Sequence, residues 1–357
     1  MPGPLIHADA DAFFASVALR RHPELLERPV VVAGGPVVAC AAYPARAHGV
    51  RAGMSLLEAR RACPGLVVLP LPGDEVEAVS DALLRLFAEL VPAVEPGSME
   101  EAFLDTSALS WSAAERLGHE LRARVRRELG LPVTVGLGRT KLMAKTASRA
   151  AKPDGLRAIT PDEETALRHH APLGELWGVG ERTRARLELA GVTTLGQLDR
   201  LDPPTLHRLC GTTMARRLRA MADGTDDAVV RPVRARRTLS AEAATSGWGR
   251  PDRTLAELVD VVVERVCHRA AEAGLAAATV TVLLRSGGEV RSGGEVGSGG
   301  EARTVRRGRL PRPGADPAEV RAVVSELLAD HPEPPEILSV TLGDLVPADR
   351  PQQDALF

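Results

Sequence analysis

The fold is decided by the stretch Ile6-His7-Ala8-Asp9-Ala10-Asp11-Ala12-Phe13-Phe14-Ala15-Ser16. It predicts a short apolar strand that runs directly into a helix begun by two aromatic residues. Asp9 and Asp11 are two residues apart, so both carboxylates lie on one face of that strand. Neighbouring carboxylates repel unless a cation or a proton lies between them, which makes this face a candidate metal site. Taken alone, the pair is equally consistent with one aspartate capping the following helix.

The composition is typical of a soluble globular protein with several domains. The 357 residues are enough for two to four domains with their own cores, and 44% of them are hydrophobic and 26% charged. The formal net charge is −2, so any contact with nucleic acid must come from local basic patches. The four cysteines lack the spacing of a zinc site or a disulfide framework. The sequence shows neither a secretory leader nor a membrane-spanning run, so we expect a cytoplasmic protein.

Lysine is confined to one part of the chain. The three lysines, Lys141, Lys145 and Lys152, fall within a twelve-residue window of a chain that is otherwise rich in arginine. One explanation is a genome that favours arginine codons, in which these three lysines are simply the few that are left. The clustering instead favours a site that needs a compact ammonium group, as phosphate sites do.

Strands alternate with helices over the first 160 residues, which indicates an α/β or α+β domain. The pattern predicts helices at 13–21, 55–61, 74–90, 113–129 and 140–151. It predicts strands at 29–34, 36–42, 66–69 and 132–137, and a β-hairpin at 94–105.

The hairpin at 94–105 carries the second acidic pair, Glu100 and Glu101, directly after a turn at Gly97 and Ser98. Consecutive residues of a regular strand face opposite sides, so both glutamates serve one site only if Glu100 sits in the irregular turn. The alternative is an acidic turn that faces solvent.

The later part of the chain contains features suited to a phosphate backbone. Gly178-Val179-Gly180 separates two helices and presents backbone N–H groups to an anion, although a tight interhelical turn has the same pattern. Residues 231–237 hold four arginines and no acid, which predicts a basic linker. The following α+β unit has predicted helices at 255–273 and 317–328 and predicted strands at 277–284 and 303–310.

An insert with the repeat Ser-Gly-Gly-Glu, residues 286–301, is expected to form the mobile tip of a hairpin between those two strands. The returning strand is lined with arginine, which suits a phosphate backbone. The arginines are Arg303, Arg306, Arg307, Arg309 and Arg312.

Six stretches together resemble the Y-family of translesion DNA polymerases, in its DinB branch. In family order they are HADADAFFASV, AYPARAHGVRAGM, VEPGSMEEAFLDTS, VGLGRTKLMAKTASRAAKPDG, LWGVGERT and the terminal QDALF. The resemblance implies an α+β, right-hand polymerase with a ferredoxin-like palm, small fingers, a helical thumb with a helix-hairpin-helix and an α+β little finger. The implied domains are palm 1–11 and 75–165, fingers 12–74, thumb 166–230, linker 231–237, little finger 238–346 and tail 347–357.

The resemblance also implies the residues of a polymerase site. Two Mg²⁺ ions, with Mn²⁺ as a substitute, would be bound through Asp9, the Ala10 carbonyl, Glu100 and Glu101. Asp11 would support the site or cap the helix.

The incoming deoxynucleoside triphosphate would meet a second set of residues. Phe14 matches the steric gate that excludes a ribose 2′-hydroxyl. The residues matched to triphosphate contacts are Cys40, Tyr43, Arg46 and Lys152. Lys141 and Lys145 match no such role, and we expect them to meet DNA phosphate or solvent.

Primer–template DNA and a sliding clamp are the implied macromolecular partners of a monomer. The DNA backbone would be gripped by Gly178, Gly180, Arg236, Arg237, Arg303, Arg306 and Arg307. The tail would dock into the clamp through Gln353, Leu356 and Phe357.

Three residues depart from the family pattern. Glu100 stands where the family has aspartate, Cys40 where it has threonine, and Ala47 where a second basic residue often follows. One extra methylene moves a carboxylate by about 1.5 Å, a displacement to which catalysis is sensitive. We therefore expect weaker catalysis or nucleotide binding than in a typical relative.

The function expected is low-fidelity, template-directed addition of deoxynucleotides to a primer 3′ end, without proofreading. One alternative is a catalytically weak or inactive family accessory that binds DNA and the clamp. Another is a metal-dependent phosphohydrolase or sugar-nucleotide transferase, which leaves the Gly-Val-Gly turn, the arginine-lined strand and the tail unexplained.

Overall fold

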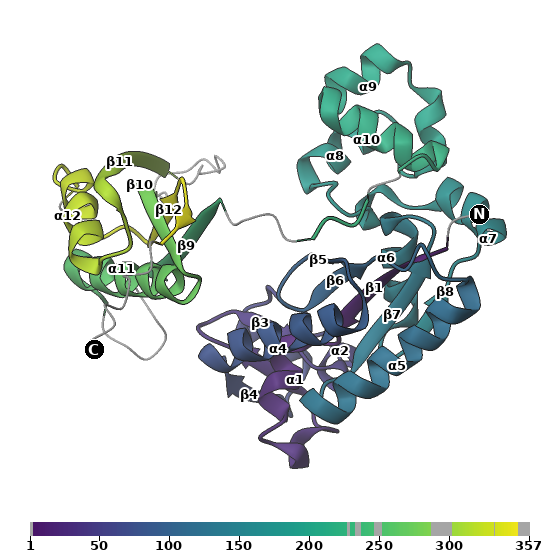
Figure 1. The fold of residues 1–357 in the computed structure, drawn as a ribbon, viewed down its shortest axis with the longest axis horizontal. Coiled ribbons are helices and arrows are strands. Elements are labelled where there is room, and N and C mark those ends of the chain that lie inside the picture. Colours follow the sequence, from purple (N-terminus) through teal and green to yellow (C-terminus); the bar gives the residue numbers. More distant parts are fainter. Residues whose placement is uncertain are drawn as a thin grey trace, which may run out of the picture. The chain divides into compact units, whose positions relative to one another are not determined.

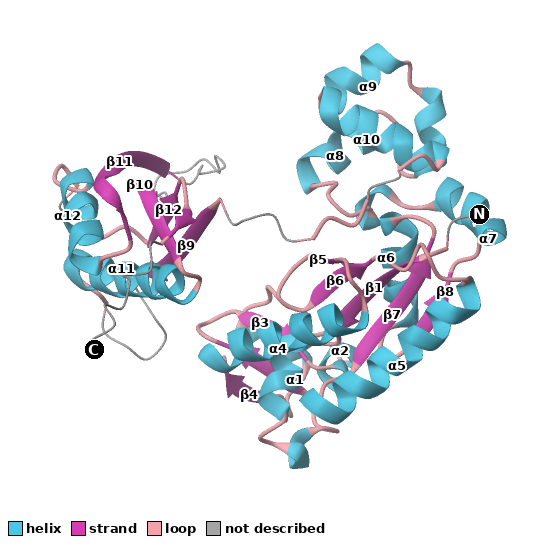
Figure 2. Ribbon diagram, in the orientation of Figure 1, coloured by secondary structure: helices cyan, strands magenta, loops and turns pink. Residues whose placement is uncertain are grey.

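The computed structural model describes residues 3–226, 229–232, 237–245, 252–286, 302–331 and 333–348. It is a mixed α+β structure of two compact units, shown in Figures 1 and 2. The first unit runs from Met1 to Val233 and the second from Arg234 to Phe357. The boundary between them falls within the predicted basic linker.

A five-stranded sheet of order β5-β6-β1-β7-β8 forms the centre of the first unit (Figure 1). Its strands are β1 (Leu5–Ala10), β5 (Val94–Pro96), β6 (Glu101–Leu104), β7 (Val133–Gly138) and β8 (Leu156–Ala158). The helices packed on it are α4 (Asp74–Leu90), α5 (Trp111–Leu129) and α6 (Lys141–Ala151). The predicted helix at 74–90 and the hairpin at 94–105 are confirmed.

The two faces of this sheet differ in chemistry because side chains alternate along each strand. Ile6, Ala8 and Ala10 of β1 join the apolar core under α4 and α5. His7 and Asp9 point the opposite way, toward α6. That helix approaches the sheet closely because β7 has glycine on this face: a Cβ at Gly136 would lie 2.1 Å from the Ala144 carbonyl oxygen.

A smaller three-stranded sheet of order β3-β2-β4 follows β1 in the chain. It comprises β2 (Val30–Ala33), β3 (Val38–Ala41) and β4 (Val67–Pro70), with α1 (Phe13–Leu19), the 3₁₀ turn η1 (Pro23–Leu25), α2 (Tyr43–Ala47) and α3 (Leu56–Ala62). The helix predicted at 55–61 is α3, and Ser55 caps it through a capping box with Glu58.

Helices make up the rest of the first unit. They are α7 (Pro161–His170), η2 (Leu173–Glu175), α8 (Glu181–Leu189), η3 (Leu195–Arg200), α9 (Pro203–Cys210) and α10 (Thr212–Asp223). Their apolar core includes Leu142 and Met143 of α6, so α6 packs against both the central sheet and these helices.

The second unit is a four-stranded antiparallel sheet of order β11-β10-β12-β9, with β13 (Val346–Pro347) paired to β10. Its remaining elements are β9 (Thr238–Ala244), α11 (Leu255–Glu272), β10 (Leu275–Ser286), β11 (Ala302–Gly314), α12 (Pro317–Leu327) and β12 (Ile337–Gly343). Both helices pack on one face (Figure 2). β10 and β11 pair up to Ser286 opposite Ala302, as expected for the hairpin, and insert residues 287–301 lie outside the described residues.

Within the described ranges, no helix combines the length and the apolar character needed to cross a membrane.

Candidate active site

Strand register brings the two acidic motifs together. β1 lies between β6 and β7, and Asp9 is directly opposite Glu101 on β6. The Ala10 N–H donates a hydrogen bond to the Glu100 carbonyl at 2.9 Å, which places the bend before β6 beside the end of β1. The sequence motifs are 91 residues apart, so this juxtaposition is a property of the fold.

Two lysine ammonium groups hold this carboxylate pair. Lys152 Nζ lies 2.5 Å from Asp9 Oδ1 and 3.8 Å from Asp11 Oδ1. Lys145 Nζ donates to both carboxylate oxygens of Glu101, at 2.7 and 2.5 Å. The site therefore attracts cations, and its oxygen donors are of the kind that Mg²⁺ prefers.

The prediction that Lys141 and Lys145 meet DNA phosphate or solvent is wrong. Both are buried, and Lys141 Nζ donates to Glu95 Oε2 at 2.6 Å. They are four residues apart, so they project from one side of α6. That side faces the sheet, where alternation presents the acids of β5 and β6.

His7 completes the buried side of the site, and it was not among the site residues predicted from the sequence. Its Nδ1 bonds Ser148 Oγ at 2.7 Å, and its Nε2 lies 3.3 Å from Glu101 Oε2 without a well-oriented hydrogen bond among the described residues. Burial lowers the pKa of His7, which favours the neutral ring. His7, Asp9 and Glu101 each offer a ligand atom within 4.8 Å of the others. Side chains alternate along a strand, so His7 lies on the same face of β1 as Asp9. This alternation is the signal in the sequence that could have identified it.

The charge state of Glu101 suits a metal ligand. Burial alone would raise the pKa of this carboxyl group, but the contacts with His7 and Lys145 outweigh burial and hold the pKa at about 2. Glu101 is therefore ionised at neutral pH. Glu100 is not in the compact group of ligand atoms, and within the described part of the chain its carboxylate makes no hydrogen bond or ion pair.

Asp11 is a structural residue. It is 1% exposed, and its carboxylate accepts hydrogen bonds from the Tyr43 hydroxyl (3.1 Å), Thr134 Oγ1 (2.7 Å) and the Asp154 N–H (2.8 Å). Burial raises its pKa, opposed by the bonds from Thr134 and Asp154. The helix-cap interpretation is wrong, because α1 begins after Ala12 without a side-chain cap.

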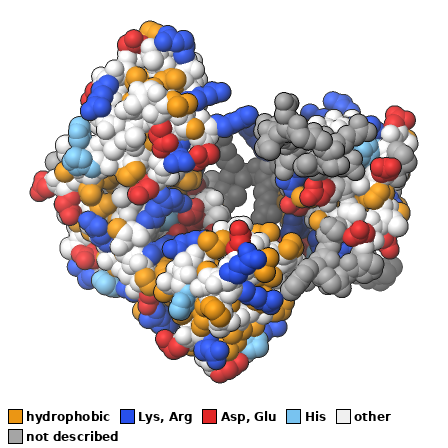
Figure 3. Space-filling view, turned by 180° about the vertical axis from the view of Figure 1, so that it is seen from behind, with side chains coloured by type: hydrophobic (Ala, Val, Ile, Leu, Met, Phe, Trp, Pro, Cys, Tyr) orange, Lys and Arg blue, Asp and Glu red, His pale blue; other side chains and the backbone are white. Residues whose placement is uncertain are grey.

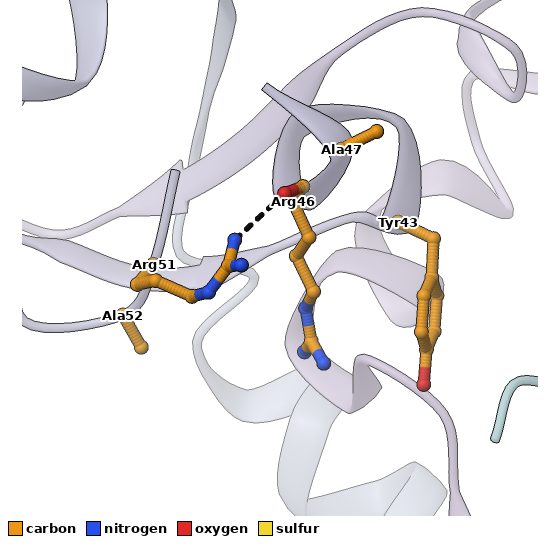
Figure 4. A pocket seen from close by; sticks show the side chains of 5 residues that line it. All are labelled: Tyr43, Arg46, Ala47, Arg51 and Ala52. Atoms are coloured by element: carbon orange, nitrogen blue, oxygen red, sulfur yellow. Dashed lines mark hydrogen bonds between the residues drawn. The ribbon is translucent and has the colours of Figure 1, made fainter. Parts of the chain in front are cut away.

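A basic pocket lies beside this network and is lined by α2 and the loop that follows it. Figure 4 shows the Arg46 guanidinium alongside the Tyr43 ring, 4.8 Å from its centroid, and Arg51 donating to the Arg46 carbonyl at 2.7 Å. The pocket has a volume of about 680 Å³, and Ala47 and Ala52 complete its lining. Burial, followed by the charge of Asp11, raises the pKa of Tyr43 and keeps its hydroxyl protonated. Arg51 was not assigned from the sequence.

Two further predicted nucleotide contacts lie near this pocket. Phe14 is half-buried, whereas Phe13 is 3% exposed and belongs to the core. The gate role of Phe14 stays a prediction. Cys40 is buried on β3 within the cluster that packs on α1.

The Gly-Val-Gly segment is a tight turn that opens α8, as predicted. Gly178 has φ of +81°, a conformation that strains other residues, and a Cβ there would lie 2.3 Å from Arg217 Nη1 and require that side chain to move. Gly180 is the N-cap residue of α8, and no atom would crowd a Cβ at that position.

The arginines of β11 divide between the two faces of the second sheet. Arg303, Arg307 and Arg309 pair with β10 residues of the face that the helices leave uncovered. Arg306 was predicted to contact DNA, but it lies on the face that the helices cover. It pairs with buried Val282, and its guanidinium donates to the Leu327 carbonyl of α12. Strand alternation is the reason. Figure 3 shows basic side chains interspersed with acidic ones over the face drawn, in keeping with the small net charge.

The remaining predicted contacts belong to the linker and the C-terminal tail. Arg237 is exposed at the start of the second unit, whereas Arg236 lies outside the described residues. The tail residues Gln353, Leu356 and Phe357 lie outside them as well.

Comparison with known proteins gives consistent matches along the chain. Residues 8–149 match the impB/mucB/samB family, and residues 238–355 match the C-terminal domain of that family. DNA polymerase IV of Alkalilimnicola ehrlichii is 36% identical over 364 residues, covering 99% of both chains. DNA polymerase IV of Halorhodospira halophila is 36% identical over 361 residues, covering 98% of this chain and 97% of the relative.

Solved structures agree in fold. A Y-family DNA polymerase chimera matches with a TM-score of 0.80 at 21% identity, covering 96% of this chain and 99% of its own. An insertion ternary complex of Dbh DNA polymerase matches with a TM-score of 0.70 at 21% identity, with the same coverage.

Proposed function

Because this chain belongs to the Y-family of translesion DNA polymerases, as a homologue of DNA polymerase IV, we propose that Asp9 and Glu101 bind its catalytic metal ions. The enzyme is a DNA-directed DNA polymerase of DNA damage tolerance. The observation that carries the proposal is the register that sets Asp9 opposite Glu101 on neighbouring strands.

The donor set supports Mg²⁺, with Mn²⁺ as a substitute. When bound, two such ions would activate the primer 3′-hydroxyl and hold the triphosphate. Asp9 and Glu101 supply ionised oxygens, and the Ala10 carbonyl and the Glu100 carboxylate are the remaining proposed ligands. Glu100 makes no competing contact among the described residues, so its side chain is available to turn toward Asp9.

Lys152, Tyr43 and Arg46 are the proposed triphosphate contacts. Lys152 reaches Asp9, so its ammonium lies where the triphosphate and the metal-binding carboxylates would meet. The bond from Tyr43 to Asp11 fixes the ring beside Arg46. Cys40 supplies at most a weak thiol donor. Phe14 is the proposed gate against ribonucleotides.

The finer architecture follows the family pattern. We assign the central sheet with α4, α5 and α6 to a ferredoxin-like palm (1–11 and 75–165). The smaller sheet is assigned to the fingers (12–74), and helices α7–α10 to a thumb with a helix-hairpin-helix (166–230). The second unit is assigned to the little finger (238–346).

Primer–template DNA is the proposed partner of both units. Gly178 and Gly180 would bring backbone N–H groups against a phosphate. The uncovered face of the second sheet would offer Arg303, Arg307 and Arg309. Arg236 and Arg237 remain proposed contacts with the DNA backbone. The tail at 353–357 is the proposed contact with a sliding clamp, and we place the enzyme in the cytoplasm as a monomer.

Primer extension tests the proposal. We expect the wild-type protein to extend a primer with Mg²⁺ or Mn²⁺, and Asp9→Ala and Glu101→Ala to lose this activity. Glu95→Ala is the matched control, because Glu95 pairs with Lys141 and lies outside the compact group of ligand atoms. If wild type extends no better than Asp9→Ala, the assignment of this site is refuted.

A catalytically weak or inactive accessory that binds DNA and the clamp is the second candidate. The observation that favours it is the position of the Glu100 carboxylate outside the compact ligand group, together with its extra methylene. Primer extension by Glu100→Asp separates the two functions. A rise in rate supports an active polymerase with a displaced ligand, whereas no activity in either form favours the accessory.

A further inference from the structure

Lys145 has a place in this structure that the polymerase mechanism proposed above does not use. Its side chain is 10% exposed, and its ammonium binds both carboxylate oxygens of Glu101. A cation that approaches Glu101 meets the positive charge of this ammonium, which repels the cation and occupies part of the acceptor capacity of both oxygens. Lys145 is therefore an internal competitor for the metal.

The same ammonium also faces Trp177. Lys145 Nζ lies 5.8 Å from the Trp177 ring centroid, within the range of a cation–π contact. The ammonium contacts Glu101 and the Trp177 ring at the same time. The ring therefore remains a neighbour of the ammonium when a metal ion takes Glu101.

Trp177 directly precedes the turn that we propose to grip DNA. Its carbonyl accepts a hydrogen bond from Arg217 at 2.8 Å, and the Arg217 guanidinium lies 5.1 Å from its ring centroid. Arg217 also lies where a Cβ of Gly178 would be. The position of the Trp177 ring and the shape of the turn are therefore set by the same contacts.

The ring also reaches the catalytic strand. Trp177 lies 5.7 Å from the ring centroid of Phe103, which is 1% exposed and stands two residues after Glu101 on β6. A continuous set of contacts thus runs from Glu101 through Lys145 and Trp177 to Gly178.

We propose that Lys145 and Trp177 are positioning residues that couple DNA binding at the Gly178–Gly180 turn to metal binding at Glu101. Without DNA, Lys145 holds Glu101 and weakens metal binding. A DNA phosphate at the turn draws the ammonium toward Trp177 and releases Glu101, so DNA raises the affinity for metal. By linkage, the metal raises the affinity for DNA by the same factor. The inference rests on the proposed metal site.

The test measures Mn²⁺ binding by electron paramagnetic resonance, with and without a primer–template ending in a dideoxynucleotide. We expect this DNA to tighten Mn²⁺ binding to the wild type by about fivefold or more. Lys145→Met should bind Mn²⁺ more tightly than wild type in the absence of DNA, and DNA should have no further effect. The loss of the DNA effect is the discriminating result, because removing any positive charge beside Glu101 would tighten Mn²⁺ binding.

Three further variants complete the design. Trp177→Leu keeps the lysine on Glu101 but should lose the effect of DNA, whereas Lys145→Arg should retain it. Lys141→Met is the matched control, because that lysine binds Glu95 and should leave Mn²⁺ binding at the wild-type level. Fluorescence of Trp177, in a chain with Trp111→Phe and Trp248→Phe, gives an independent signal of the ammonium moving as Mg²⁺ is added.

The outcomes separate this inference from the proposed function. If wild type binds no more Mn²⁺ than Asp9→Asn, the proposed metal site fails. If wild type binds Mn²⁺ but Lys145→Met neither tightens binding nor removes the effect of DNA, the coupling proposal is overturned and the metal site stands.

Discussion

Replacing Asp11 with alanine separates a hydrogen-bonded, buried carboxylate from the proposed metal ligand Asp9 two residues before it. Asp11 joins three parts of the first unit: Tyr43 of α2, Thr134 of β7 and the backbone of the turn that follows Lys152. Asp11→Ala removes the two oxygens that accept all three hydrogen bonds, at a site that water does not reach, since the residue is 1% exposed.

The magnitude follows from the donors left behind. Thr134 is fully buried, and the Asp154 N–H loses its acceptor, at a cost of about 1–3 kcal/mol for each buried donor. The Tyr43 hydroxyl is half-buried and can turn to water. Removing a carboxylate that burial disfavours offsets part of this loss. We expect the free energy of unfolding to fall by about 2–4 kcal/mol.

Urea unfolding followed by tryptophan fluorescence measures this change. A Trp248→Phe background leaves both remaining tryptophans in the first unit, which makes the transition assignable. Asp105→Ala is the matched control, because that aspartate makes only local bonds to Ser107 in the described structure, and it should cost below about 1 kcal/mol.

Asp9→Ala should abolish activity with a smaller loss of stability than Asp11→Ala. The Michaelis constant for nucleotide should rise in Asp11→Ala, because Tyr43 and the turn after Lys152 lose their anchor. An unfolding free energy for Asp11→Ala within about 0.5 kcal/mol of wild type would refute the reasoning.

Three other predictions concern separate parts of the chain. Glu100→Asp should raise kcat in primer extension by about tenfold, because it shortens a misplaced ligand; no activity in either form would favour the accessory function. Deleting Gln353–Phe357 should abolish clamp-stimulated synthesis and leave distributive synthesis intact, whereas equal loss of both would contradict the tail's assignment. Burial, followed by the charge of Glu264, raises the pKa of Cys267 to about 11, so its reaction with a disulfide reagent should keep accelerating above pH 9. A rate that levels off by about pH 10 would instead show an ordinary thiol with a pKa of about 8.5.

The sequence predicted the parts of the site that depend on local pattern. Alternating strands and helices, the hairpin at 94–105 and the capped helix after Ser55 all follow from periodicity and turn chemistry, and the structure confirms them. The facing of Asp9 and Glu101 was implied by the resemblance and agrees with the observed register.

Contacts that depend on how elements pack could not be predicted. Lys141 and Lys145 look exposed in the sequence, and their burial results from the glycines of β7 that bring α6 onto the acidic face of the sheet. The partners of Asp11 come from three separate segments. Strand β9 was missed because Thr238–Ala244 is rich in alanine and carries a glutamate, a composition with weak strand propensity.

The central claim is that Asp9 and Glu101 bind the catalytic metal. The most direct test is a crystal structure of the enzyme with primer–template, a non-hydrolysable nucleotide and Mn²⁺, located by its anomalous scattering. We predict Mn²⁺ within about 2.0–2.4 Å of oxygens of both Asp9 and Glu101, with Lys145 displaced from Glu101. Mn²⁺ bound elsewhere, with Lys145 still on both oxygens of Glu101, would contradict the account.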